Sequence, residues 1–279
     1  MRSNALRVLI FGAAASLAAA QTFDVASVKP AAPESRYAMK GGPGTSDPGQ
    51  ITYSKVTLKS LLLKAYGIGW YQLAAPSWVD DAKYDIVAKV PPGTTTEQLQ
   101  PMLRNLLAER FRLVVHRETK ELPIYALVVG KNGPKLKVSA TEPEAEATEG
   151  PQVTSVSLAK DGLPAMPAGY KGHVIGMTVG GKTMLRAKGE TLKDFAKMLT
   201  DMLDRPVFDL TNLTEKYDFG IAWSVEQTFE HESNLPPGLE PGPNLFTAFQ
   251  AQLGLKLDPR RMTIEMVVVD SVERAPTAN

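Results

Sequence analysis

The sequence predicts an α+β protein made of two related lobes, each with two helices packed on a small mixed or antiparallel sheet. Two segments carry this prediction: TLKSLLLKAYGIGWYQLAAPSWVDDAKYD, from Thr57 to Asp85, and TLKDFAKMLTDMLDRPVFDLTNLTEKYD, from Thr191 to Asp218. Both begin with Thr-Leu-Lys, continue with apolar residues at helical spacing, and end with Lys-Tyr-Asp before an alternating strand pattern. We therefore expect an internal repeat in which Tyr84 and Tyr217 occupy corresponding buried positions.

The first segment predicts a helix and then a strand. Thr57 can cap a helix over Leu58–Ala65, and Gly67 ends it. The alternation from Tyr84 to Val90 predicts a strand with one buried face. A second helix is expected from about Gln98, because Pro101 argues against an earlier regular start. Two strands, residues 113–116 and 124–129, are expected to follow, joined by the charged turn RETKEL.

The second segment predicts the same order of elements. Thr191 is expected to cap a helix, with Asp194 at the position of a capping box. Strict alternation from Tyr217 to Val225 predicts a strand. A short helix around Phe249 and a hairpin with the sequence GLKLDPRRMTIEMVVVD are expected to complete this lobe.

The N-terminus has the order of a secretory signal peptide. Two arginines precede an apolar run from Leu6 to Leu17, and Ala18–Ala20 supply small side chains for cleavage. The run is shorter than the ~20 apolar residues of a spanning helix, so we expect no membrane anchor after cleavage and a periplasmic or secreted product. The predicted divisions are a signal peptide (1–20), a first lobe (21–140), an acidic, proline- and glycine-rich linker (141–172), a second lobe (173–274) and a tail (275–279).

Composition narrows the function classes. Removal of residues 1–20 leaves 29 basic against 30 acidic residues, so no basic field attracts nucleic acid. The chain has no cysteine, which excludes disulfides, thiolate catalysis and cysteine metal sites.

Several sequence blocks resemble a known group of proteins. These blocks are FDVASVKP, VTLKSLLLKAYGI, PSWVDDAKYDI, MLRNLLAERFRLVVHRETKELPIYALVVGKNGPKL, RPVFDLTNLTEKYDF and FTAFQAQLGLKLDPRR. In these blocks the chain resembles the soil-bacterium-associated secreted proteins that contain a domain of unknown function, and the resemblance extends over nearly the whole chain after residue 20. The resemblance implies no activity and no catalytic residues. More distantly, the lobes are similar to small signalling domains of secretins and outer-membrane receptors, which bind protein segments.

The motif GMTVGGKT, from Gly176 to Thr183, satisfies the phosphate-loop pattern. A phosphate loop needs a strand before it and a helix directly after it. Here Lys182 and Thr183 lead into an expected strand, so a glycine-rich loop is favoured and no nucleotide is expected.

Two aspartates and three histidines are further candidates for a functional site. Asp85 and Asp218 suggest one carboxylate per lobe, as in aspartic proteases, but no turn exposes them, and a solvated strand position is favoured. His116, His173 and His231 lack a second ligand at metal spacing, so no metal site is expected. No G-x-S-x-G elbow is present.

An aromatic cluster supplies the candidate ligand contacts: Tyr66, Trp70, Tyr71 and Trp78. A loop with amphipathic rings could grip a peptide or stack on a sugar, while core packing is the alternative. We predict a non-enzymatic binding or interaction module without cofactor, whose partner is an envelope or extracellular protein or peptide that an exposed strand edge could also recruit. The alternatives are an extracytoplasmic hydrolase of cell-wall or extracellular polymers with an unrecognised carboxylate site, and a purely structural envelope protein.

Overall fold

The computed structural model describes residues 22–140, 156–167, 170, 172–224 and 243–277. The chain forms two compact units: unit 1 comprises residues 1–117 and 267–279, and unit 2 comprises residues 118–266. Strands account for 42% of the structure and helices for 24%, and the described residues form three four-stranded sheets and four helices. The predicted α+β fold class is therefore wrong. The protein is mostly β, rather than two lobes that each place two helices on a small sheet.

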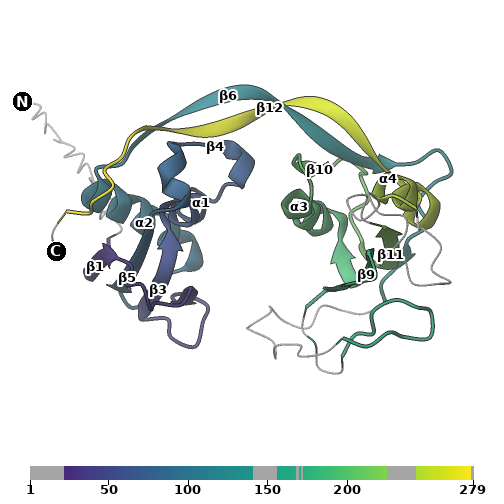
Figure 1. The fold of residues 1–279 in the computed structure, drawn as a ribbon, viewed down its shortest axis with the longest axis horizontal. Coiled ribbons are helices and arrows are strands. Elements are labelled where there is room, and N and C mark those ends of the chain that lie inside the picture. The colour runs from purple at the N-terminus through teal and green to yellow at the C-terminus, as the bar shows by residue number, and fades with distance from the viewer. Residues whose placement is uncertain (1–21, 141–155, 168–169, 171, 225–242, 278–279) are drawn as a thin grey trace, which may run out of the picture. The chain divides into compact units, whose positions relative to one another are not determined.

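Unit 1 contains an antiparallel sheet with the strand order β1-β5-β3-β2. Its strands are β1 (Val25–Pro30), β5 (Lys83–Lys89), β3 (Gln50–Thr57) and β2 (Ala38–Gly41). Helices α1 (Leu58–Tyr66) and α2 (Thr96–Phe111) belong to the same unit (Figure 1). Their apolar sides share one core with the sheet, in which the largest buried side chains include Phe111, Leu61, Leu62 and Ile86.

The caps of these helices follow from local chemistry. The Thr57 hydroxyl accepts a hydrogen bond from the Ser60 amide at 3.1 Å, and Gly67 ends α1 in the left-handed region with φ of 63°. Both features confirm the sequence prediction. Helix α2 begins at Thr96, two residues before the predicted start, and includes Pro101.

Unit 2 contains an antiparallel sheet with the order β7-β11-β9-β8. Its strands are β7 (Lys137–Val138), β11 (Lys216–Ser224), β9 (Lys182–Thr191) and β8 (Val174–Val179). Helix α3 (Leu192–Met202) follows β9, and the Thr191 hydroxyl caps it by accepting from the Asp194 amide at 3.1 Å. Helix α4 (Leu245–Ala248) continues into a π-helical turn, Phe249–Leu253.

The two Lys-Tyr-Asp motifs adopt the same local geometry in their sheets. Tyr84 and Tyr217 are buried, at 2% and 6% exposure, which confirms their predicted inward positions. Each following aspartate binds the amide of a residue with positive φ in the neighbouring strand, where the strand register shifts. Asp85 Oδ1 accepts from the Lys55 amide at 2.7 Å, and Asp218 Oδ1 accepts from the Gly189 amide at 2.9 Å.

The third sheet has the order β10-β6-β12-β4 and contains the two longest strands, β6 (Val114–Val129) and β12 (Leu255–Ser271) (Figure 1). The short outer strands are β10 (Val207–Asp209), parallel to β6, and β4 (Leu73–Ala74), parallel to β12.

These long strands correct two predictions. The segment RETKEL is not a turn between two strands but the middle of β6, and the predicted C-terminal hairpin is the single strand β12. The charged middle of β6 is exposed, and Arg261 on β12 donates to Glu121 on β6 at 3.0 Å. Because β6 and β12 are neighbours in the sheet, their backbone groups form hydrogen bonds with each other. Neither strand therefore needs a hairpin turn to pair its backbone groups.

No described helix has the length and apolar character needed to cross a membrane.

Candidate functional site

The predicted ligand contacts lie in unit 1, at the end of α1 and on the chain between α1 and β5. After Gly67, a 3₁₀ turn (Trp70–Gln72) forms, and a second 3₁₀ turn (Ser77–Asp80) follows β4. The Gln72 amide donates to the Gly69 carbonyl at 3.0 Å, and the Gln72 side chain accepts from the Gly69 amide at 3.1 Å. These two bonds hold the backbone that carries Trp70 and Tyr71 in one conformation.

The four aromatic residues differ in exposure. Trp70 is 39% exposed, and its ring meets Tyr71 edge to face with centroids 5.8 Å apart. Tyr66 is half-buried at the end of α1, where the Arg104 guanidinium lies 5.7 Å from the ring centroid. Trp78 packs against the unit 1 core, with the Arg274 guanidinium 6.0 Å from its ring centroid. Trp70 thus presents the largest exposed aromatic surface of the four, whereas Trp78 serves packing as well.

Two arginines act on the Tyr66 hydroxyl. Burial raises the pKa of the Tyr66 hydroxyl, and the charges of Arg104 and Arg117 partly oppose that rise. Burial also raises the pKa of Tyr71. Both hydroxyls therefore stay protonated at neutral pH and can donate hydrogen bonds. Arg104 is oriented by a bond from Nη1 to the Ala65 carbonyl at 3.3 Å. We call Tyr66, Trp70, Tyr71 and Arg104 the aromatic site.

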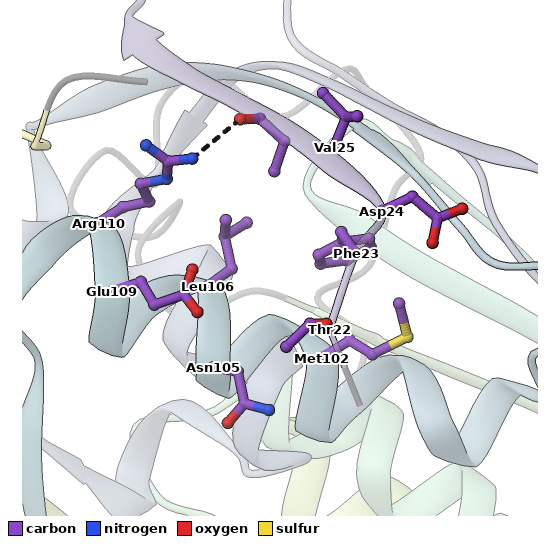
Figure 2. Close-up of a pocket in the computed structure, with 10 residues that line it drawn as sticks. Thr22, Phe23, Asp24, Val25, Met102, Asn105, Leu106, Glu109 and Arg110 are labelled. Carbon is purple, nitrogen blue, oxygen red and sulfur yellow. Dashed lines mark hydrogen bonds between the residues drawn. The ribbon is translucent and has the colours of Figure 1, made fainter. Parts of the chain in front are cut away.

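A second surface of unit 1 was missed by sequence reasoning. A groove of about 330 Å³ lies between residues 22–26 and one side of α2, and Figure 2 shows the residues that line it. Met102 and Leu106 line its apolar part, while Glu109 and Arg110 supply charge, and Arg110 Nη2 donates to the Ala26 carbonyl at 3.3 Å. Met102 and Leu106 lie on helix α2, whose existence the sequence predicted, but the groove forms only where residues 22–26, far away in the sequence, approach this helix.

The imidazoles and carboxylates are not assembled into one site. His116 Nδ1 lies 2.7 Å from Asp270 Oδ1, and these side chains are 50% and 42% exposed. Asp270 was not foreseen as a partner, because it joins His116 only through the β6–β12 neighbourhood. His173 Nδ1 lies 3.2 Å from the Lys188 carbonyl, and His231 falls outside the described residues.

Asp85 and Asp218 lie on strands β5 and β11 with intermediate exposure, and their carboxylates accept backbone amides, as described above. Within the part of the chain that is described, no cluster of three His, Cys, Asp or Glu side chains could hold a metal ion. Lys182 begins β9 after the turn Gly180-Gly181, and the motif GMTVGGKT is therefore a β-hairpin rather than a strand followed by a helix. The arrangement can bind through rings, guanidinium groups and grooves, and His116–Asp270 is an open surface pair.

Comparison with known proteins identifies a family but no activity. The chain matches no curated protein and no solved structure at a significant level. Residues 59–272 match the family described as "Protein of unknown function (DUF3738)". This match covers more than half of the sequence. The chain therefore belongs to the DUF3738 family.

Proposed function

We propose that the protein is an extracytoplasmic binding module that captures a protein or peptide through the aromatic site, without a catalytic step. The observation that carries this proposal is the exposure of Trp70 on a turn whose backbone is held by the Gly69–Gln72 hydrogen bonds. Large rings exposed to water are unfavourable for an isolated domain and favourable at an interface.

Preorganisation supports the same function. A binding surface loses less conformational entropy when its anchors are already ordered before the partner arrives. Trp70 is held edge to face against Tyr71, and Arg104 is held by Tyr66 and the Ala65 carbonyl. A partner with apolar or aromatic side chains next to a carboxylate would meet complementary groups here.

The extracytoplasmic location rests on the order of charged, apolar and small residues in the N-terminal 20 residues. These residues lie outside the described part of the chain. The mass of the exported protein tests the location, because cleavage after Ala20 leaves a chain that starts at Gln21.

We also infer that the two segments that end in Lys-Tyr-Asp are an internal repeat. Support comes from the helix-capping threonine at the start of each segment and from the aspartate that binds a positive-φ residue at its end.

The test of binding compares variants with one aromatic ring removed. Immobilised wild-type protein is screened against a panel of peptides, esters and glycans, with capture and turnover measured separately. We expect Trp70→Ala to weaken capture by about 2 kcal/mol, or about thirtyfold, because buried aromatic anchors dominate interface energies. Tyr37→Ala is the matched control, since Tyr37 is 66% exposed at a different part of unit 1, and it should leave capture unchanged.

The hydrolase alternative has a distinct signature in the same assay. Reproducible turnover that His116→Ala or Asp270→Asn abolishes would overturn the binding proposal. Equal losses of capture in Trp70→Ala and Tyr37→Ala would show that the aromatic site is not the binding surface.

A further inference from the structure

A short segment of unit 2 lies on the sheet like a bound peptide. We call residues 156–167 the strap. It forms its own turn: the Ala159 amide donates to the Leu163 carbonyl and the Ala165 amide donates to the Ser157 carbonyl, both at 2.8 Å. Gly162, with φ of 75°, allows the turn. Because these backbone bonds are internal to the strap, its attachment to the sheet depends largely on side chains.

Arg186 on β9 makes the polar attachment. Its Nε donates to the Pro164 carbonyl at 2.7 Å, and its Nη2 lies 2.6 Å from both carboxylate oxygens of Asp161. The Arg186 side chain is 26% exposed. Because Asp161 belongs to the strap, Arg186 would lose this carboxylate if the strap left. The Asp161 carboxylate is 53% exposed, and an ion pair open to water contributes little to holding the strap in place.

Leu163 makes the apolar attachment at Gly220 on β11. A Cβ atom added to Gly220 would lie 2.2 Å from Leu163 Cδ1, so any side chain there would displace the leucine. Gly220 does not have the positive φ that would itself require glycine. The missing side chain therefore leaves room for the end of the Leu163 side chain, and we call this position the Gly220 notch.

The strap does not fill the surface on which it lies. An open groove of about 770 Å³ remains between it and strands β9 and β11. Lys160, Lys188 and Asp218 lie along this groove, and Arg186 and Gly220 line it too. The surface thus joins a guanidinium, a leucine notch and unfilled space.

We propose that this face of β9 and β11 is a peptide-binding site, occupied in the resting chain by its own strap, and that it accepts a turn with a carboxylate two residues before a leucine. The chemistry of the occupant is given by the strap itself: Asp161 pairs with Arg186, and Leu163 fills the Gly220 notch. The strap acts as an internal competitor, because tethering gives it a high effective concentration. This site is in unit 2 and does not depend on the aromatic site of unit 1.

A strap-disabled receptor tests the site. The full chain with Asp161→Asn and Leu163→Ala keeps the groove but lacks both anchors of the internal competitor. A fluorescent synthetic peptide of residues 157–165 should bind this receptor at least tenfold more tightly than it binds wild-type protein, measured by fluorescence anisotropy. Adding Arg186→Gln, which also removes the bond to the Pro164 carbonyl, or Gly220→Val to the receptor should weaken binding at least tenfold. A peptide with Asn in place of Asp161 should bind about threefold more weakly, as expected for loss of a partly exposed ion pair.

A measurement on wild-type protein keeps the proposal testable if the receptor folds poorly. Trypsin cleavage after Lys160 should be slow while the strap is docked and should accelerate when excess peptide displaces it. The peptide for this test carries Ala at the position of Lys160, so that trypsin spares it. A natively folded receptor that does not bind the peptide, binding insensitive to both Arg186→Gln and Gly220→Val, or cleavage unaffected by the peptide would each overturn the proposal.

Discussion

At the scale of single residues, the backbone amide that each aspartate binds explains why the Lys-Tyr-Asp motif occurs twice. A residue with positive φ interrupts the strand pairing beside each motif. Without the aspartate, the amide of this residue would have no hydrogen-bond acceptor in the neighbouring strand. Asp85 accepts the Lys55 amide at 2.7 Å and the Ser35 hydroxyl at 2.9 Å. The periodicity of the sequence predicted the buried tyrosine beside it, but not this role, because the bound amide lies 30 residues away in the chain.

Replacing Asp85 by alanine should destabilise the protein by about 2 kcal/mol, because it leaves the Lys55 amide without its charged acceptor. Chemical denaturation measures the free energy of unfolding. Asp24→Ala is the matched control: Asp24 is exposed, and its loss should change stability by less than about 0.5 kcal/mol. A similarly small effect for Asp85→Ala would show that the irregular pairing does not need the carboxylate.

The same carboxylate predicts a pH dependence. Desolvation raises the pKa of Asp85, but hydrogen bonds from Lys55, Ser35 and Ala32 together with the charge of Lys55 outweigh it, so the net pKa is lowered. A lowered folded-state pKa gives stability that is present above the unfolded value of 3.8 and lost as the pH falls through the folded value. The difference in stability between wild type and Asp85→Ala should therefore shrink in acid below pH 3.8.

At the scale of elements, the motif GMTVGGKT shows how a pattern can satisfy two structures. Its glycines are those of a two-residue turn between β8 and β9, where Gly180 and Gly181 have φ of 55° and 74°. Positive φ at both central residues is what a tight hairpin turn of this kind requires. A phosphate loop would need a helix directly after Lys182, and β9 occupies that place.

Alanine at Gly180 or Gly181 should cost about 1 kcal/mol each, because the left-handed region penalises a Cβ atom. Lys182→Ala should change stability by less than about 0.5 kcal/mol. Thermal melts of the three variants separate the two readings of the motif. If Lys182→Ala were the most damaging of the three changes, the lysine would have a role that the hairpin does not explain.

Helices and short strands were predictable because their signals are local. Thr57, Thr191 and Gly67 mark helix ends through their own side-chain or backbone chemistry. The long strands β6 and β12 were missed because charged residues in RETKEL and LDPRR are typical of turns, and only pairing with a distant strand makes them extended. Three members of the aromatic site, Tyr66, Trp70 and Tyr71, were predicted from the sequence as ligand contacts. Arg104 was not predicted, and the fourth predicted contact, Trp78, packs against the unit 1 core, because these arrangements depend on tertiary packing.

At the scale of the whole molecule, the chain passes between its two units twice. Unit 1 contains residues 1–117 and takes back residues 267–279 after unit 2 is complete. The returning segment supplies Val267 and Val268 to pair with β4, and the Arg274 carbonyl accepts the Tyr84 hydroxyl at 2.6 Å. A division into two lobes that are each continuous in sequence could not include this return, because unit 1 is completed by residues 267–279.

Ending the chain after Met266 should therefore destabilise unit 1 selectively. The truncation removes the buried Val267, the partner of β4 and the acceptor of the Tyr84 hydroxyl, while residues 118–266 of unit 2 stay intact. We expect a loss of at least ~3 kcal/mol in unit 1, the scale of deleting one large buried side chain. Hydrogen exchange measures both units at once, through the amides of Ile86 in unit 1 and Ile221 in unit 2.

A shorter truncation is the control for this experiment. Ending the chain after Pro276 removes the two bonds that Thr277 makes, from its amide to the Arg110 carbonyl and from its hydroxyl to the Glu109 carbonyl. It keeps β12 and Arg274, so unit 1 should lose less than about 1 kcal/mol, since exposed hydrogen bonds contribute little net stability. Protection that falls at Ile86 but not at Ile221 after truncation at Met266 would show that the C-terminal strand completes unit 1. An equal fall at both amides would instead mean that the two units unfold as one, and the division of the chain at residues 117 and 266 would have no energetic meaning.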